Sequence, residues 1–250
     1  MALPKVKVMY HTLTLPSTGK ELRFRPFLVK EEKILMMAMQ SGESKDMISS
    51  LKDIINNCME EDIKVNELAM FDFEYIFLQL RARSVGDTID IKYSEPEKIC
   101  SKDSKECNFT SVLNIDEIEI PKITKLKDLI NITDKIKVKL RWPKVDDAAA
   151  LGNLNLEGND TSELVESTFT VIGNCIEYIM DGEEMFKVKD HTKKDVDDFL
   201  NSLSSSQFKS IQEYFETLPK VTKDVISTCT KCGNTDTKHL EGVGDFFALG

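Results

Sequence analysis

The sequence predicts an α+β protein in which helical layers pack against small antiparallel sheets. Apolar residues recur at helical spacing between residues 31 and 84 and again between 162 and 218. Residues 87–142 and 221–241 instead alternate apolar and polar side chains, as half-buried strands do. Four cysteines in two distant pairs connect these two β-rich stretches, and a chain of 250 residues can bury one large core or two smaller ones.

Residues 5–28 are expected to contain two short strands. Apolar and polar residues alternate on both sides of the turn sequence Pro-Ser-Thr-Gly at residues 16–19. The two strands can pair as a hairpin. Pro26 limits the length of the second strand, because proline has no backbone N–H to donate.

Three helices are expected to follow the hairpin. The first begins with the acidic residues 31 and 32, which suit the positive end of a helix dipole, and it ends at Gly42. The second covers residues 46–59 and the third covers residues 66–84. Asp72 stands where an N-cap would divide the third helix into two pieces.

The chain then changes to β-structure. Strands are expected at residues 89–93, 112–120 and 136–142, where apolar and polar side chains alternate. The polar, cysteine-flanked stretch 95–109 is expected to be a loop, and Pro143 closes the last strand.

The remaining residues are expected to return to helices before a final strand. Residues 146–159 form a connection, and residues 162–181 form a helix. Two further helical runs follow, the first capped by Thr192 or Asp195. The final strand leads into the C-terminal cysteine pair.

These elements divide the chain into three regions. Residues 1–86 are the N-terminal strands with a helical region, and residues 143–220 are a second helical region. Residues 87–142 and 221–250 come together as a β-rich, zinc-ribbon-like region. The ribbon therefore joins parts of the chain that are distant in sequence.

The cysteines of this ribbon carry the chemistry that the sequence suggests. Cys229 and Cys232 form a CxxC pair followed by Gly233, which lets a tight turn present two thiolates to one metal ion. Cys100 and Cys107 are expected to supply the other half of a tetrahedral site. Each pair follows one expected strand and precedes another, as in a zinc ribbon. Four thiolates leave no open position for water, so the expected cofactor is a structural zinc ion.

Other interpretations of the cysteines remain open. Cys229 and Cys232 could be the site of a thiol redox protein, which would need the pair at the start of a helix. The two pairs could also be unrelated thiols, and His239 could replace a ligand of the first pair. Cys58 and Cys175 lie on apolar helix faces and are expected to pack in the core.

Composition and motifs limit the possible functions. The 43 acidic residues outnumber the 33 lysines and arginines, so the net charge of −10 disfavours nucleic-acid binding. No apolar run is long enough to span a bilayer, and the first residues lack the apolar core of a signal peptide. A reducing cytoplasm is therefore the expected compartment. The phosphate-binding, hydrolase and metalloprotease motifs of common enzymes are missing, so we do not expect an enzyme.

The C-terminal residues form an aromatic tail after flexible glycines. Phe246, Phe247 and Leu249 could anchor the tail in a groove of a partner, since aromatic anchors dominate interface energies. The same residues could instead pack against the domain that carries them.

Five segments carry a resemblance to a known family. They are FRPFLVKEEK at residues 24–33, FDFEYIFL at 71–78, LRARSVG at 80–86, CTKCG at 229–233 and LEGVGDFF at 240–247. Together they resemble the T4-like phage baseplate protein family over nearly the whole chain. Residues 143–220 contain no matching motif. The gap of six residues between Cys100 and Cys107 is longer than in the family pattern, which bears on the metal geometry.

The resemblance implies a non-enzymatic role in building the central hub of a contractile tail. The protein would be either a minor hub component or an assembly factor, that is, an assembly chaperone. The implied partners are baseplate hub proteins, with the tape-measure protein as a further candidate. The implied location is the host cytoplasm, with the tail baseplate of the virion as the second possibility.

Overall fold

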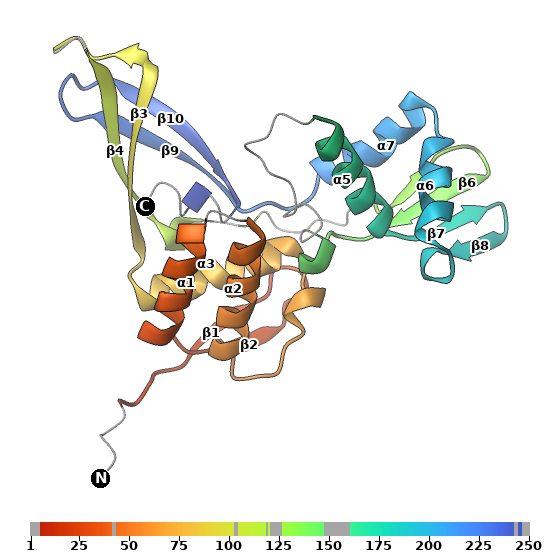
Figure 1. Cartoon of the computed structure of the whole chain (residues 1–250), viewed down its shortest axis with the longest axis horizontal. Coiled ribbons are helices and arrows are strands. Elements are labelled where there is room, and N and C mark those ends of the chain that lie inside the picture. Colours follow the sequence, from red (N-terminus) through yellow and green to blue (C-terminus); the bar gives the residue numbers. More distant parts are fainter. Residues whose placement is uncertain are drawn as a thin grey trace.

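A computed structural model describes residues 6–41, 44–102, 105–118, 120, 127–147, 161–242 and 245–246. It confirms the α+β prediction, with helices and small antiparallel sheets. Figure 1 shows three parts: a helical base, a long β-stranded arm that projects from it, and a lobe of mixed structure beside it. None of the helices in the described ranges is long and apolar enough to cross a membrane.

The base begins with the expected hairpin. Strands β1 (His11–Thr14) and β2 (Glu21–Phe24) pair antiparallel, with Leu13 opposite Leu22. Both leucines are buried, whereas their neighbours along each strand are exposed: Thr12 and Thr14 in β1, and Glu21 and Arg23 in β2. The alternation in the sequence therefore marks the face that packs on the helices.

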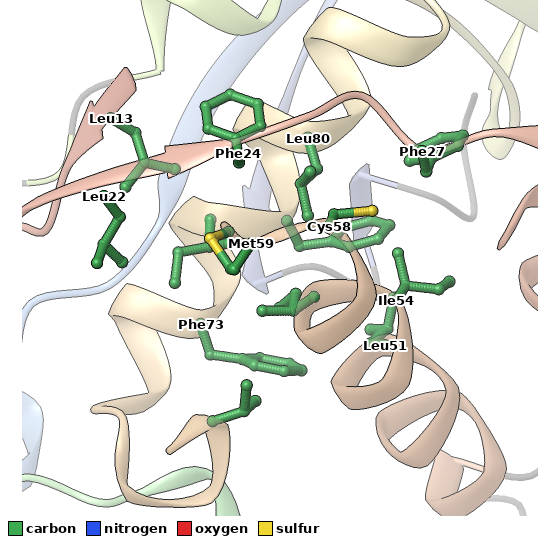
Figure 2. Packing of buried hydrophobic residues seen from close by; sticks show 14 of the residues in the cluster. Leu13, Leu22, Phe24, Phe27, Leu51, Ile54, Cys58, Met59, Phe73 and Leu80 are labelled. Atoms are coloured by element: carbon green, nitrogen blue, oxygen red, sulfur yellow. The ribbon is translucent and has the colours of Figure 1, made fainter. Parts of the chain in front are cut away.

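Three helices cover this face of the hairpin: α1 (Val29–Ser41), α2 (Ser44–Cys58) and α3 (Met70–Ser84). Figure 2 shows side chains of the hairpin, α2 and α3 gathered in one core. Helix α3 is buried on more than one side. Phe77 and Leu80 belong to the core of the base, while residues 78 and 82 belong to the core of the arm. A helix with apolar residues on more than one face must be enclosed in this way.

The expected role of Asp72 as an N-cap is wrong. The residue before α3 is Ala69, and a separate 3-10 turn (Val65–Glu67) precedes it, so the division of residues 66–84 falls earlier. The Asp72 carboxylate accepts a hydrogen bond from the Ser17 backbone N–H at 3.0 Å and another from the Ser17 hydroxyl. The aspartate therefore holds the hairpin turn against α3.

The arm is a four-stranded sheet with the order β10-β9-β4-β3. Its strands are β3 (Thr88–Ile99), β4 (Glu106–Asn114), β9 (Thr222–Cys229) and β10 (Thr235–Glu241). The expected loop at residues 95–109 is wrong, because β3 and β4 extend through most of it. The strands of an arm that projects into solvent can carry polar residues on both faces. Such strands lack the apolar–polar alternation by which a strand is predicted.

The expected strand at 112–120 also ends earlier than predicted. After β4, Ile115–Glu117 form a 3-10 turn, and the Asn114 side chain accepts a hydrogen bond from the Asp116 N–H at 2.9 Å. The asparagine thus ends the strand by capping the turn.

The lobe contains a second four-stranded sheet, with the order β5-β6-β7-β8. Its strands are β5 (Leu129–Asn131), β6 (Ile136–Leu140), β7 (Ile176–Asp181) and β8 (Glu184–Lys187). The sequence predicts that residues 129–140 belong with the ribbon. Because β6 pairs with β7, these residues belong with the lobe instead. Residues 143–220 are therefore not purely helical.

Helices α5 (Thr161–Asn174), α6 (Lys193–Asn201) and α7 (Ser205–Glu216) complete the lobe. The helix expected at 162–181 is too long. It stops at Asn174, and the alternating sequence that follows becomes β7. Thr192 caps α6 as expected, in a capping box with Asp195.

A short stretch of chain ties the lobe to the base. Ala69 forms an isolated antiparallel bridge with Lys144, and the Met70 N–H donates to the Pro143 carbonyl at 3.0 Å. The rings of Phe71 and Trp142 meet edge to face, with centroids 5.4 Å apart. The start of α3 is thus the attachment point of the lobe.

Candidate metal centre

The four cysteines of the ribbon meet at the end of the arm. Cys100 follows β3 and Cys107 lies in β4, whereas Cys229 ends β9 and Cys232 lies in the turn before β10. Their sulfur atoms all lie within 4.8 Å of one another, and the Cys107 and Cys232 sulfurs are 3.7 Å apart. A tetrahedral zinc ion with Zn–S bonds of about 2.3 Å would hold its sulfurs about 3.8 Å apart. The cluster therefore has the composition and size of a zinc site.

The cysteines are thiols or thiolates and not disulfides. None of the six cysteines, all of which lie in the described ranges, forms a disulfide bond, and the 3.7 Å between the Cys107 and Cys232 sulfurs is far beyond the roughly 2.05 Å of such a bond. The sulfurs of the cluster are thus available as ligands.

The two hairpin turns are closed in the same way. The Cys100 N–H donates to the Lys105 carbonyl at 2.7 Å, and the Cys229 N–H donates to the Asn234 carbonyl at 2.8 Å. The second turn needs Gly233 at φ 79°, a conformation that other residues adopt rarely. In the first pair, Cys107 lies beyond the closing bond and inside β4, which accounts for the longer spacing.

Electrostatics differ between the two halves of the cluster. The backbone N–H groups of Cys232 and Lys231 point at the Cys229 sulfur and lower the pKa of this thiol to about 6. Burial and the neighbouring sulfurs raise the pKa of Cys107 to about 12. Four adjacent thiolates repel one another, and a divalent cation at their centre is what would let all four lose their protons.

The cluster is enclosed by residues that the sequence analysis did not single out. Tyr93 stacks on Phe109, with ring centroids 5.4 Å apart, and Phe109 is fully buried beside the cysteines. The Tyr93 hydroxyl donates to Asp236 at 2.8 Å, and Lys98 pairs with the same carboxylate. These contacts tie β3 to β10 across the sheet. Only the register of the strands reveals them, because residues 93 and 236 are far apart in sequence.

The remaining cysteines and His239 lie outside this cluster. Burial raises the pKa of Cys58 to about 11 and that of Cys175 to about 12, as expected for thiols that serve only to pack the core. His239 places its Nδ1 atom 2.6 Å from Asp224 and is half-exposed. Within the described ranges, the candidate metal cluster consists of the four ribbon cysteines.

The structure places one residue of the aromatic tail. Phe246 is 1% exposed and packs with Leu78, Val225 and Leu240 in the core of the arm. This is the arrangement in which the tail packs on its own domain. Phe247 and Leu249 lie outside the described residues, and their contact with a partner stays a prediction.

Fold and site together define an α+β protein that carries a four-cysteine ribbon at the end of a β-stranded arm. The family model described as T4 bacteriophage base plate protein matches residues 8–248, and the chain therefore belongs to this family. The match confirms the resemblance seen in the sequence. No curated protein and no solved structure matches the chain.

Proposed function

We propose that this baseplate protein helps to build the central hub of the phage tail baseplate through protein–protein contacts, without enzymatic activity, and that a structural zinc ion holds its arm together. Membership in the baseplate family supports a structural role in the phage tail. The observation that carries the proposal is the closed cluster of four buried or half-buried cysteines at the end of the arm. Such a shell leaves no open position for a substrate or a water molecule.

The two hairpins of the arm are joined over a short length only, next to the cysteines. Strands β4 and β9 pair only through Phe109 with Cys229 and Thr110 with Thr228, and one hydroxyl bond between Ser111 and Ser227 follows at 2.8 Å. A bound zinc ion contributes on the order of 10 kcal/mol to the folding of small zinc domains. Zinc at the cysteines would therefore fix the two hairpins as one rigid arm.

The expected partners are baseplate hub proteins, with the tape-measure protein as a further candidate. The arm and the lobe project from the base in different directions, so each can present a separate surface during assembly (Figure 1). Assembly would take place in the host cytoplasm, and a minor hub component would also remain in the virion baseplate.

A phage that lacks the gene tests the proposed function. We expect infected cells to contain no complete baseplates by electron microscopy, and a plasmid with the wild-type gene to restore them. Mass spectrometry of purified virions then separates a hub component from an assembly factor. Normal tails in the absence of the protein would refute the proposal.

A thiol redox function is the second candidate, because the lowered pKa of Cys229 is also a property of reactive CxxC pairs. The local structure favours metal binding, since β9 and β10 flank the pair and a redox CxxC begins a helix. Elemental mass spectrometry with a free-thiol count separates the two functions. We expect one zinc ion per chain and four thiols that become reactive only after a chelator removes the metal, whereas a redox protein would contain no metal.

A further inference from the structure

The lobe contains an open groove of about 720 Å³ between its sheet and the helices α5 and α6. This volume lies within the roughly 300–1,000 Å³ of ordinary ligand sites. Basic residues from three parts of the lobe line the groove; they are Arg141, Lys144, Lys187, Lys189 and Lys193. The groove belongs to the region in which the sequence analysis found no motif.

The charge of the groove is opposite to that of the whole chain. Arg141 and Asp147 neutralise each other in a bidentate ion pair, with Nη1–Oδ2 and Nη2–Oδ1 distances of 2.7 and 3.2 Å. The four lysines then face two acidic groups of the lining, Glu177 and Asp197. None of these lysines forms a salt bridge to a residue that the structure describes. The lining of the groove therefore has a local excess of positive charge, although the net charge of the whole chain is −10.

The ion pair also fixes the wall of the groove. The Arg141 guanidinium donates to the Asn174 carbonyl at 2.6 Å, which joins the start of the lobe to the end of α5. Asp147 accepts a further hydrogen bond from the Lys144 backbone N–H at 2.7 Å. These bonds hold one wall of the groove in place without a ligand.

An apolar pocket of about 260 Å³ adjoins the groove. Val188, His191 and Val196 line both cavities, so one continuous surface joins the lysine-lined groove to a mainly apolar pocket, whose lining also includes the carboxylates of Asp181 and Asp195. Phe186 of β8 lines the apolar side and is 40% exposed. Strand β8 pairs only with β7, so its outer edge is open within the described lobe.

We propose that this pair of cavities binds a segment of a partner protein in which carboxylates stand next to a large apolar side chain. The proposal rests on the proposed function, because it names the chemistry of a partner in assembly. A polynucleotide fits less well. The net charge of −10 repels polyanions, and the apolar pocket offers nothing to a phosphate backbone.

The test uses the full chain and an array of overlapping 15-residue peptides from the other baseplate proteins of the same phage. We expect bound peptides to combine Asp or Glu with Phe, Leu or Met. Fluorescence anisotropy with the best peptide should show a Kd about tenfold weaker for Lys187→Glu combined with Lys189→Glu, with a smaller salt dependence than wild type. The control is Lys209→Glu, an exposed lysine on α7 outside both cavities, which should bind as wild type does.

A second variant tests the apolar half. Phe186→Ala should weaken the same peptide while keeping the wild-type salt dependence, because it removes contact area and no charge. Melting curves by circular dichroism check that all variants fold. These exposed substitutions should leave the melting temperature close to that of wild type.

Three results of the binding experiments would overturn the inference: no peptide binds, a single-stranded oligonucleotide binds more tightly than every peptide, or Lys209→Glu weakens binding as much as the groove variants. Failure of the proposed function looks different, since the gene would then be dispensable for baseplates whatever the peptides do. If the wild-type plasmid restores tails and the groove double variant also restores them fully, only the inference about the groove is refuted.

Discussion

The arm and the lobe each contain a four-stranded antiparallel sheet, but they stabilise it in different ways. The lobe sheet packs against α5, α6 and α7, and Val138, Ile172 and Ile211 meet in its core. Within the described residues no helix covers the end of the arm, and its small core consists of Phe109 and the buried cysteines. Adjacent strands of the lobe also pair over more residues than β4 and β9 do. A sheet that lacks a helical cover needs another source of stability, and four cysteines can provide it through a metal ion.

The largest expected effect is the loss of the metal from the arm. Cys232→Ser should abolish zinc binding and unfold the end of the arm, with a loss on the order of the 10 kcal/mol that zinc contributes in small zinc domains. Hydrogen exchange should show lost protection in β4 and β9 and retained protection in β6 and β7. Thr230→Ser, which changes the turn but no ligand, is the control. A variant with unchanged melting temperature and zinc content would contradict the zinc proposal.

The reverse experiment breaks the lobe and leaves the arm intact. Ile211 is fully buried in the lobe, and Ile211→Ala should cost about 2–5 kcal/mol because it leaves a cavity. Urea unfolding followed by circular dichroism measures the loss, and the zinc content should not change. Lys209→Ala on the exposed side of the same helix serves as the matched control. Loss of zinc in Ile211→Ala would show that the two regions are not independent.

A smaller effect is expected at the cap of α6. Thr192→Ala removes the hydroxyl that accepts from the Asp195 N–H and should cost about 1 kcal/mol. Thr192→Ser keeps the hydroxyl and should stay close to wild type. Thermal unfolding of both variants separates the cap from the general effects of substitution. Equal melting temperatures for the two variants would mean that the cap does not stabilise the lobe.

The smallest effect concerns pH. Hydrogen bonds from the Thr192 side chain and backbone lower the pKa of Asp195. The folded pKa lies below the unfolded value of about 3.9, so the carboxylate stabilises the lobe at neutral pH, and this contribution disappears as the pH falls through the folded pKa. Asp195→Asn removes the titration. The difference in melting temperature between the variant and wild type should therefore shrink between pH 6 and pH 3, and a constant difference would contradict this assignment.

Helices in the base were predictable because their evidence is local. The apolar spacing of residues 46–59 and the acidic residues at the start of α1 indicate helices, because a helix depends on residues only one turn apart. Asp72 misled the prediction, since its carboxylate serves a turn 55 residues earlier. Residues 176–181 were assigned to a helix because an apolar run of this length fits both periods. Only the pairing with β6 decides that they form a strand.

The cysteine cluster could be predicted because the spacing of the ligands and the order of the flanking strands can be recognised in the sequence. Its surroundings could not. Lys98, Tyr93 and Asp236 meet only through the register of four strands, two of which come from the end of the chain. The groove of the lobe was missed for the same reason, since its lysines come from a strand end, a turn and a helix start that look like ordinary solvated charges.

The order of strands in the arm has one more consequence. Strands β4 and β9 are neighbours in the sheet, and the whole lobe lies between them in sequence. The Lys223 ammonium of β9 donates to the Glu117 carbonyl just after β4 at 3.2 Å, so the chain leaves the arm and re-enters it at adjacent points. The lobe is thus an insertion with closely spaced ends, and such a module can diverge or be exchanged while the base and the arm keep their pairing.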